Sequence, residues 1–507
     1  MNELTSRSLL ARNTVWNLVG QVAPLVVAIF AIPLLIKGLG TDRFGVLTLA
    51  WVVIGYFSVF DLGLGRALTQ LVAKKLGAGQ EGEIPALVWT NLILVLIIGL
   101  VGTLALSLLS PWLVKGALKI PKGLQPEALN AFYLLALSIP VVTSTAGLRG
   151  LLEAYQRFDL TNLVRIPLGI FTFLGPLLIL PFSRSLLPVV AILAIGRLIA
   201  WVVHLFLCFK VIPAMVRGVV LQVKLVRQLI LFGSWMTVTN IVGPLMMYLD
   251  RFLIGGLLSV AAVAYYATPY EVVTKLLIIP AALAGVLFPA FSTGFTQDRS
   301  HTELLFSRGV KYIFLSLFPI SLLIVTLASE GLDLWLGAEF AKNSTRVLQW
   351  LTVGVFINSL AQMAFALIQG TGRPDLTAKL HLIELPFYLV MVWWLIGAYG
   401  IEGAAIAWVV RIVVDTIILF GMAQRFLPTT ASIIKRKVLA MGVALLILAL
   451  ASLQASLVVK GLFLLLTLFV FVPASWFLIL APDERVMIAS PFKTIQSHNP
   501  MEKCQDD

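Results

Sequence analysis

Charged side chains are scarce in this sequence. They make up 12% of its 507 residues, against 60% for hydrophobic residues, and the mean hydropathy is +0.99. A soluble globular chain has about 25% charged and about 45–50% apolar residues. The shortage of charge excludes a soluble domain, and the apolar excess excludes a disordered chain, which could not stay solvated. The composition therefore predicts a protein that lies in a membrane.

Cysteine, histidine and soluble catalytic motifs are also scarce. Of the two cysteines, Cys208 lies in an apolar segment and Cys504 in a polar tail, which excludes a disulfide framework or a cysteine metal cluster. The four histidines lack metal-ligand spacing. The sequence has no GxxxxGK[ST], GxSxG or HExxH motif. We therefore expect no enzyme and no cofactor or metal.

Long apolar runs fill most of the chain. A bilayer-spanning helix needs roughly 20 apolar residues, and the sequence predicts an all-α polytopic membrane protein of about 14 spans. The first run is too long for a signal-peptide core and no small-residue cleavage site follows it, so we expect it to be retained. The predicted spans are residues 13–36, 43–65, 86–110, 128–149, 163–182, 187–209, 228–251, 260–291, 309–330, 346–368, 379–398, 401–424, 437–453 and 459–480.

The net charge of +13 follows a membrane pattern. Lys and Arg concentrate in alternate loops, most strongly in residues 210–227 and 435–437. Cytoplasmic loops carry such an excess, which predicts a multi-pass protein of the inner (plasma) membrane with both termini in the cytoplasm. The basic balance therefore does not indicate a nucleic-acid partner. A basic cavity for an anionic substrate is the open alternative.

An internal repeat divides the sequence. Residues 156–161, Gln-Arg-Phe-Asp-Leu-Thr, return 216 positions later as Gly-Arg-Pro-Asp-Leu-Thr in residues 372–377. Three more pairs keep a similar offset: Pro24 and Pro244, Arg197 and Arg411, Pro213 and Pro428. Two six-helix lobes of the same orientation, a parallel repeat, would explain these matches. The predicted division is an N-lobe 1–215, a C-lobe 216–430, two further helices in 431–480 and a cytoplasmic tail 481–507.

Polar amides recur inside the first predicted span. Asn13, Asn17 and Gln21 are four residues apart, which places them on one helix face. Asn240 lies in the corresponding span of the second half. Interhelical hydrogen bonds and a wet, substrate-binding cavity face both explain such residues.

Two charge pairs lie inside predicted spans. Glu271 precedes Lys275 by four residues, and Arg411 precedes Asp415 by four. Opposite charges at this spacing can neutralise each other, which favours structural pairs. As functional groups, Lys275 and Arg411 would bind an anionic substrate, and Glu271 and Asp415 would take a coupling ion.

Other titratable residues are candidates for coupling. His381 and Glu384 share a helix face and could carry a proton. Asp61 closes the second predicted span, and Asp250 with Arg251 closes the seventh. We interpret these last three as boundary charges at the membrane surface. The coupling ion, H⁺ or Na⁺, stays open.

Arg197 is the exceptional charge. It lies deep in the sixth predicted span with no acidic residue within one turn of its own helix. Its counter-charge must come from another helix or from a bound anion. Because guanidinium pairs well with phosphate, a phosphate group is a candidate for that bound anion.

Several motifs lie along both halves of the sequence. They are Asn13-x-x-Trp16-Asn17-x-x-Gly20-Gln21, then residues 32–40, 43–45 and 60–65, and in the second half residues 249–255, 264–267, Tyr270 and Pro289. Together they resemble the motifs of the polysaccharide transporter family, the Wzx-type lipid-linked oligosaccharide flippases of the multidrug/oligosaccharidyl-lipid/polysaccharide (MOP) superfamily. The likeness covers most of residues 8–430.

The resemblance implies two six-helix lobes around a cavity that opens alternately to each side. It implies transport of undecaprenyl-pyrophosphate-linked oligosaccharide repeat units for surface polysaccharide synthesis, with lipids and the polysaccharide polymerase machinery as partners. It also implies a cation-rich cavity, onto which Arg197, Lys275 and Arg411 could map.

Three other functions stay open. A multidrug or cation antiporter would share the fold, but its cationic substrates favour an acidic cavity, and Arg197 has no acidic partner on its own helix. A lipid II flippase is a close alternative. A membrane glycan polymerase is disfavoured because the predicted outer segments, such as residues 111–127, are short.

Reporter fusions test the predicted topology. Fusions at Lys74 and Arg217 should report the cytoplasm, and fusions at Lys119 and Lys342 should report the outside, because the charge bias fixes the side of each loop. A cytoplasmic signal at Lys342 would contradict the six-plus-six arrangement, since it would change the parity of the second half.

Overall fold

The computed structural model describes most of the chain. Backbone is described for residues 7–56, 63–427, 431–453, 455–482 and 484–485. Side chains within these ranges are described except at residues 7–21, 56, 66, 77, 217, 228, 230–244, 289–290, 292–297, 431–439 and 478. All secondary structure in these ranges is helical. Ten helical segments in them are long and apolar enough to cross a membrane.

The described chain forms two compact units. Unit 1 comprises residues 1–272 and 378–408, and unit 2 comprises residues 273–377 and 409–507. The lobe boundary predicted at 215/216 stays a prediction. The helices of unit 1 are α1 (Arg7–Leu39), α2 (Thr41–Tyr56), α3 (Leu64–Gly77), α4 (Ile84–Trp112), α5 (Gln125–Ala154), α6 (Phe158–Ile179), α7 (Leu186–Val211), α8 (Val223–Leu257) and α9 (Val260–Val273), which ends at the unit boundary.

Unit 2 holds the remaining helices. They are α10 (Ile278–Gln297), α11 (Arg299–Thr326), α12 (Ala328–Leu336), α13 (Ala338–Gly370), α15 (Ala431–Ala451) and α16 (Leu457–Ala474). The long helix α14 (Pro374–Phe426) contributes its middle, residues 378–408, to unit 1 and its two ends to unit 2.

Each predicted span overlaps a described helix, but the predicted number of about 14 spans stays a prediction, and two helices were missed. The break predicted between residues 398 and 401 is confirmed, because Gly400 interrupts α14 with φ 62° and ψ −141°. The helices α3 and α12 fall in predicted loops. Only one side of α3 is buried, including Ala67, Leu68 and Val72, and α12 likewise alternates buried and exposed residues. Hydropathy averaged along the sequence does not detect such amphipathic helices.

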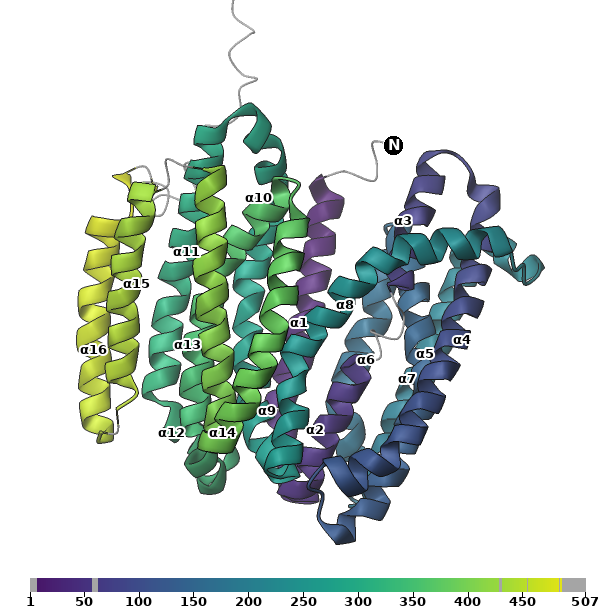
Figure 1. Ribbon diagram of the computed structural model, residues 1–507, viewed down its shortest axis with the longest axis horizontal. Coiled ribbons are helices and arrows are strands. Elements are labelled where there is room, and N and C mark those ends of the chain that lie inside the picture. Colours follow the sequence, from purple (N-terminus) through teal and green to yellow (C-terminus); the bar gives the residue numbers. More distant parts are fainter. Residues whose placement is uncertain (1–6, 57–62, 428–430, 454, 483, 486–507) are drawn as a thin grey trace, which may run out of the picture. The chain divides into compact units, whose positions relative to one another are not determined.

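Helix α5 is central in unit 1. It packs against α3, α4 and α7, and Figure 1 shows α4, α5 and α7 running side by side. A Cβ on Gly150 would lie 2.9 Å from the carbonyl oxygen of Gly65, so the backbones of α3 and α5 approach closely. Small residues permit such contact where lipid supplies no hydrophobic drive for association.

The repeat has a structural counterpart in two turns. After α5, Gln156 adopts φ 59° and donates its N–H to the carbonyl of Glu153 at 2.9 Å. Arg157 then donates its N–H to Leu152, and its guanidinium grips the carboxylate of Asp159 with two hydrogen bonds of 3.0 and 2.9 Å.

The same turn follows α13 in unit 2. Gly372 has φ 80° and donates its N–H to Gln369 at 3.0 Å, and Arg373 donates its N–H to Ile368. The guanidinium of Arg373 grips Asp375 at 2.9 and 3.2 Å. Each partner lies 216 positions after its counterpart, so the sequence repeat corresponds to a repeat of local structure.

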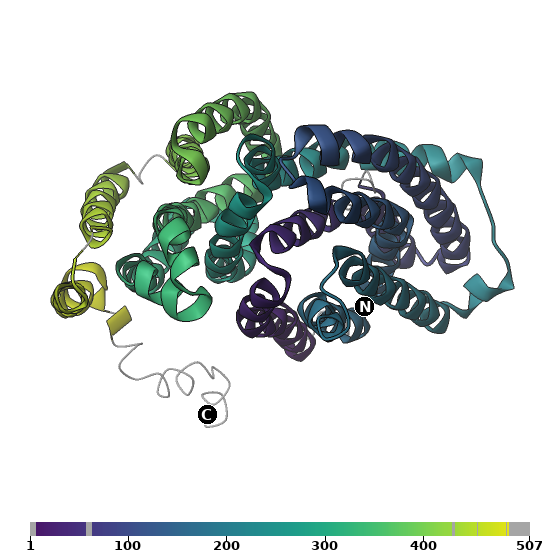
Figure 2. The same ribbon diagram turned by 90° about the horizontal axis from the view of Figure 1, so that it is seen from below.

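Unit 2 is built around α13, which packs against α10, α11 and α12. Helix α11 also packs against α15 and α16. Figure 2 shows α15 and α16 nearly end-on and side by side. Aromatic rings pack between α16 and α11. The ring centroid of Phe471 on α16 lies 4.9 Å from that of Phe318 and 6.4 Å from that of Phe314, both on α11.

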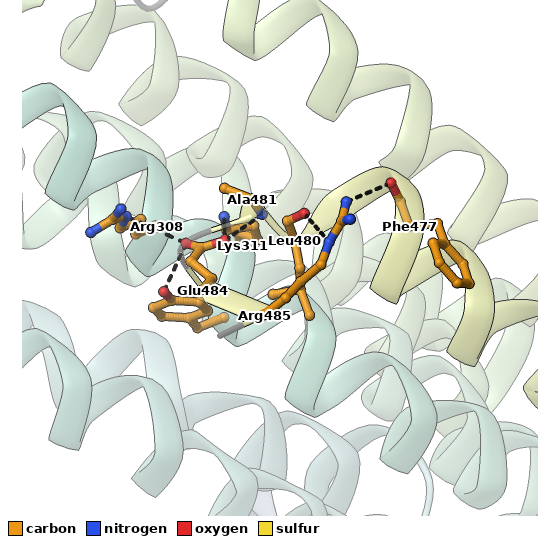
Figure 3. Close-up of polar contacts among 8 residues, drawn as sticks. Arg308, Lys311, Phe477, Leu480, Ala481, Glu484 and Arg485 are labelled. Carbon is orange, nitrogen blue, oxygen red and sulfur yellow. Dashed lines mark hydrogen bonds and ion pairs between the residues drawn. The ribbon is translucent and has the colours of Figure 1, made fainter. Parts of the chain in front are cut away.

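The buried carboxylate of Glu484 holds the segment after α16 against α11. Glu484 is 1% exposed and accepts hydrogen bonds from the Tyr312 hydroxyl and the Ala481 N–H, each at 2.8 Å. Lys311 and Arg308 of α11 form ion pairs with it (Figure 3). At the opposite end of α16, Lys460 donates to Glu330 at 2.9 and 3.1 Å. Ion pairs therefore hold the two ends of α16, one to α11 and the other to α12.

The charge of Glu484 should contribute to stability. Burial raises the pKa of this carboxyl, but hydrogen bonds from Lys311, Ala481 and Tyr312 outweigh it, so the pKa lies below its ordinary value. We expect Glu484→Gln to lower the free energy of unfolding in detergent by about 1–3 kcal/mol at pH 7. Because the folded-state pKa is depressed, this difference is present above the unfolded pKa of about 4.3 and is lost as pH falls through the folded value.

Asp333→Asn, an exposed acid of the same unit, is the control and should change little. Equal stabilities of Glu484→Gln and the unsubstituted chain at pH 7 would show that the ion pairs of Glu484 with Arg308 and Lys311 do not stabilise the fold.

Candidate functional site

A wholly buried arginine lies near the end of α8. Arg251 is 0% exposed, and its guanidinium lies between the rings of Tyr248 and Tyr270, 4.9 and 4.5 Å from their centroids. Its Nη2 donates to Glu271 of α9 at 3.0 Å. A cation between aromatic faces and a carboxylate is stabilised by both, which makes burial of the charge tolerable.

The residue before it is also buried. Asp250 is 0% exposed and accepts the backbone N–H of Arg251 at 2.8 Å through Oδ1. Its Oδ2 accepts the hydroxyl of Tyr266 at 2.5 Å. The sequence interpretation of Asp250 and Arg251 as surface boundary charges is therefore wrong. It failed because the turn between α8 and α9 folds the tyrosines of α9 back over both charges.

Asp250, Arg251, Tyr266, Tyr270 and Glu271 form what we call the buried arginine site. It lies within unit 1 and contains two carboxylates and one guanidinium. Tyr270 packs edge-on against Trp408 at 5.8 Å. Glu271 is 44% exposed at its side chain, whereas Arg251 is wholly enclosed. Glu271 is thus the member of this site that an ion or proton could reach.

The loop between α4 and α5 supports this end of unit 1. Lys119 donates its N–H to Gly255 at 2.8 Å and its ammonium to Leu257 at 2.6 Å, both carbonyls of α8. A Cβ on Gly45 of α2 would lie 1.9 Å from the carbonyl of Val260. These contacts hold the start of α9, and with it Tyr266 and Glu271, at a fixed place on unit 1.

Arg197 lies on α7, as predicted, eleven residues after Leu186 and thus about 16 Å along the helix. Its Nε is buried without a hydrogen-bond partner in the part of the chain that the structure describes. The predicted absence of an acidic partner on its own helix is consistent with this. Because buried polar atoms are normally hydrogen-bonded, Nε of Arg197 is expected to bind an acceptor that the described residues do not provide.

The other predicted residues are distributed over both units. Glu271, His381 and Glu384 belong to unit 1, and Lys275, Arg411 and Asp415 belong to unit 2. Glu271 has a partner that the sequence did not reveal, Arg251 of α8, so its prediction as a pair with Lys275 alone was incomplete. The predicted roles of Arg411, Asp415, His381 and Glu384 stay predictions, and so does an approach of Arg197 to Arg411.

Five predicted residues lie outside what the structure describes. Asp61 falls in the segment 57–62, and the other four belong to helices whose side chains are not described at those positions. These four are Asn13, Asn17, Gln21 and Asn240.

Known proteins resemble this chain in sequence and in fold. Residues 10–295 match the family described as "Polysaccharide biosynthesis protein". The "Putative O-antigen transporter" of Shigella flexneri is 31% identical over 414 residues, which cover 82% of this chain and 97% of that relative.

Two solved structures share the fold. An inward-facing multidrug resistance MATE family transporter of the MOP superfamily has a TM-score of 0.68 at 15% identity, covering 82% of this chain and 99% of its own. The lipid II flippase MurJ in an inward closed conformation has a TM-score of 0.68 at 13% identity, covering 91% and 99%. At these identities the likeness concerns the fold.

Tyr266→Phe tests the buried arginine site. Removing the hydroxyl leaves Oδ2 of a buried carboxylate without this donor, so we expect the free energy of unfolding in detergent to fall by about 1–3 kcal/mol. In an Asp250→Asn background the same change should cost less than half as much, because the carboxylate charge is gone. Tyr399→Phe, at an exposed tyrosine of unit 1, is the matched control. Additive losses in the double variant would show that the two side chains do not interact.

Proposed function

Because the chain belongs to the polysaccharide biosynthesis protein family, as its motifs predict, and has the fold of MOP-superfamily transporters, we propose that it moves lipid-linked oligosaccharides across the inner membrane. The substrate would be an undecaprenyl-pyrophosphate-linked repeat unit, which passes from the cytoplasmic to the outer leaflet for surface polysaccharide assembly. Both termini would lie in the cytoplasm.

The relative from Shigella flexneri carries this proposal. It aligns over nearly its whole length at 31% identity and bears the name of an O-antigen transporter. The neighbours described as a multidrug transporter and a lipid II flippase are 15% and 13% identical, so they support the fold alone. The sequence relationship therefore favours a glycan cargo over a cationic drug.

Arg197 is our candidate for holding the diphosphate of this cargo. A pyrophosphate that crosses the hydrocarbon region needs a cation at depth, since an unpaired anion there is costly. Guanidinium can grip two phosphate oxygens at once, which an ammonium cannot do with fixed geometry. Lys275 and Arg411 are further candidates for binding the anionic cargo during transport by alternating access.

A downhill ion would drive the cycle. Glu271 is the coupling candidate with the most definite environment, because its side chain is 44% exposed and forms an ion pair with the buried guanidinium of Arg251. Asp61, His381, Glu384 and Asp415 complete the set of candidates for H⁺ or Na⁺.

Replacement of Arg197 tests the anion role. Arg197→Ala should abolish surface glycan at unchanged protein level, because the diphosphate loses its cation at depth. Arg197→Lys should keep partial activity, since the charge remains but the two-pronged grip is lost. Glycan is measured on intact cells, with membrane protein quantified by immunoblot.

Arg184→Ala supplies the matched control. Arg184 is exposed just before α7, so its loss should leave export unchanged. Wild-type export from Arg197→Ala at equal expression would remove Arg197 from the substrate path.

A further inference from the structure

Helix α7 carries three nitrogens that lack hydrogen-bond partners. They are Nε of Arg197, Nε1 of Trp201 and Nε2 of His204, all buried and without a partner in the described structure. Spacings of four and three residues place the three side chains on one face of the helix. We call this set the α7 polar face. Over the seven residues from Arg197 to His204 it extends about 10 Å along the helix.

This face points into unit 1 rather than toward lipid. His204 is 3% exposed, and Ala200, between Arg197 and His204, is 4% exposed. The neighbouring residues Ile199 and Val202 are apolar and 58% and 51% exposed, as suits the hydrocarbon region. Helix α7 packs against α2, α5 and α6 on its inner side. The polar atoms are therefore enclosed by protein.

The hydrogen-bond roles on this face follow from chemistry. His204 Nδ1 lies 2.8 Å from the carbonyl oxygen of Ala200. A carbonyl only accepts, so Nδ1 carries the proton and Nε2 of the neutral ring is an acceptor. Arg197 and Trp201 present N–H donors. The face thus offers two donors and then one acceptor.

Water can bind to all three groups, because each molecule accepts from the N–H donors of Arg197 and Trp201 and donates to Nε2 of His204. Native proteins rarely leave buried polar atoms unpaired, and ordered water is a usual partner where protein groups are absent. An anion satisfies only the two donors. It gains the third contact when His204 takes up a proton and Nε2 becomes a donor.

We propose that the α7 polar face holds a file of water molecules leading to Arg197, and that His204 on this file binds a proton together with the anionic cargo. This deepens the proposed function, on which it rests for the identity of the anion. Proton uptake and anion binding then strengthen each other, as reciprocal linkage requires.

The charged surroundings of His204 fit this coupling. Arg149 of α5 interacts electrostatically with the ring, and Arg197 lies two turns away on the same helix. A diphosphate bound at this face would add negative charge close to the ring, and a nearby opposite charge favours the protonated imidazole. The charged residues of the helices packed on α7 are Asp42 and Arg43 of α2, Glu127, Arg149 and Glu153 of α5, Asp159 and Arg165 of α6, and Arg217 of the short helix Pro213–Arg217.

Thiol reactivity tests the water file without any transport. In a chain freed of thiols by Cys208→Ser and Cys504→Ser, single cysteines are placed at Ala200 and His204, with Ile199→Cys and Val202→Cys as lipid-facing controls. Ag⁺ reacts with thiolate, which forms only in contact with water. We expect Ag⁺ to modify the two inner positions at least about tenfold faster than the controls in lipid bilayers.

Ala200→Cys is a small change that keeps His204, so it decides the outcome if His204→Cys fails to fold. Inner positions no faster than the lipid-facing controls would overturn the water file.

Proton uptake tests the role of His204. Calorimetric titration of the full chain with inorganic pyrophosphate, in two buffers of different ionisation enthalpy at pH 7, gives the number of protons taken up on binding. The unsubstituted chain should take up close to one proton more than His204→Gln, which keeps polar groups but cannot titrate. Equal uptake, or no binding of pyrophosphate by the unsubstituted chain, would overturn the coupling. Loss of export in Arg197→Ala with equal proton uptake would leave the proposed function in place and reject His204 alone.

Discussion

The structure depends on one constraint: in a hydrocarbon environment every buried polar group needs a partner within the protein. Continuous helices meet it for the backbone. Buried side chains satisfy the constraint by packing against partner groups. The clearest case is Arg251, which forms an ion pair with Glu271 and lies against the rings of Tyr248 and Tyr270. Buried polar atoms that have no partner among the described residues, such as Nε of Arg197, are therefore the places to seek a ligand.

Two kinds of charged cluster follow from this constraint. Glu484 with Arg308 and Lys311 connects two elements and leaves no oxygen of the carboxylate without a donor. Such saturation suits a structural clasp, which keeps α16 on α11. The buried arginine site differs, because the side chain of Glu271 is 44% exposed while its ion-pair partner Arg251 is wholly enclosed. Such access suits a group that exchanges an ion.

The repeated turns show how local and distant determinants combine. Gln156 adopts the left-handed conformation that Gly372 adopts at the equivalent position. A residue with a Cβ pays strain for this backbone, yet the hydrogen bonds of the turn and the Arg–Asp grip after it are the same in both copies. The two turns therefore share their geometry although only one of them has glycine at the left-handed position.

The sequence by itself determined the membrane class, the family, the approximate positions of the long apolar helices and the break between residues 398 and 401, because composition and hydropathy act locally along the chain. It also identified Arg197, since an arginine within an apolar run is visible without a structure. Only the tertiary structure decided that Asp250 and Arg251 are buried, because their burial depends on tyrosines of the next helix folding back over them. The polar alignment of Trp201 and His204 with Arg197 was likewise hidden: the spacing is in the sequence, but the lack of partners depends on what the neighbouring helices present to that face.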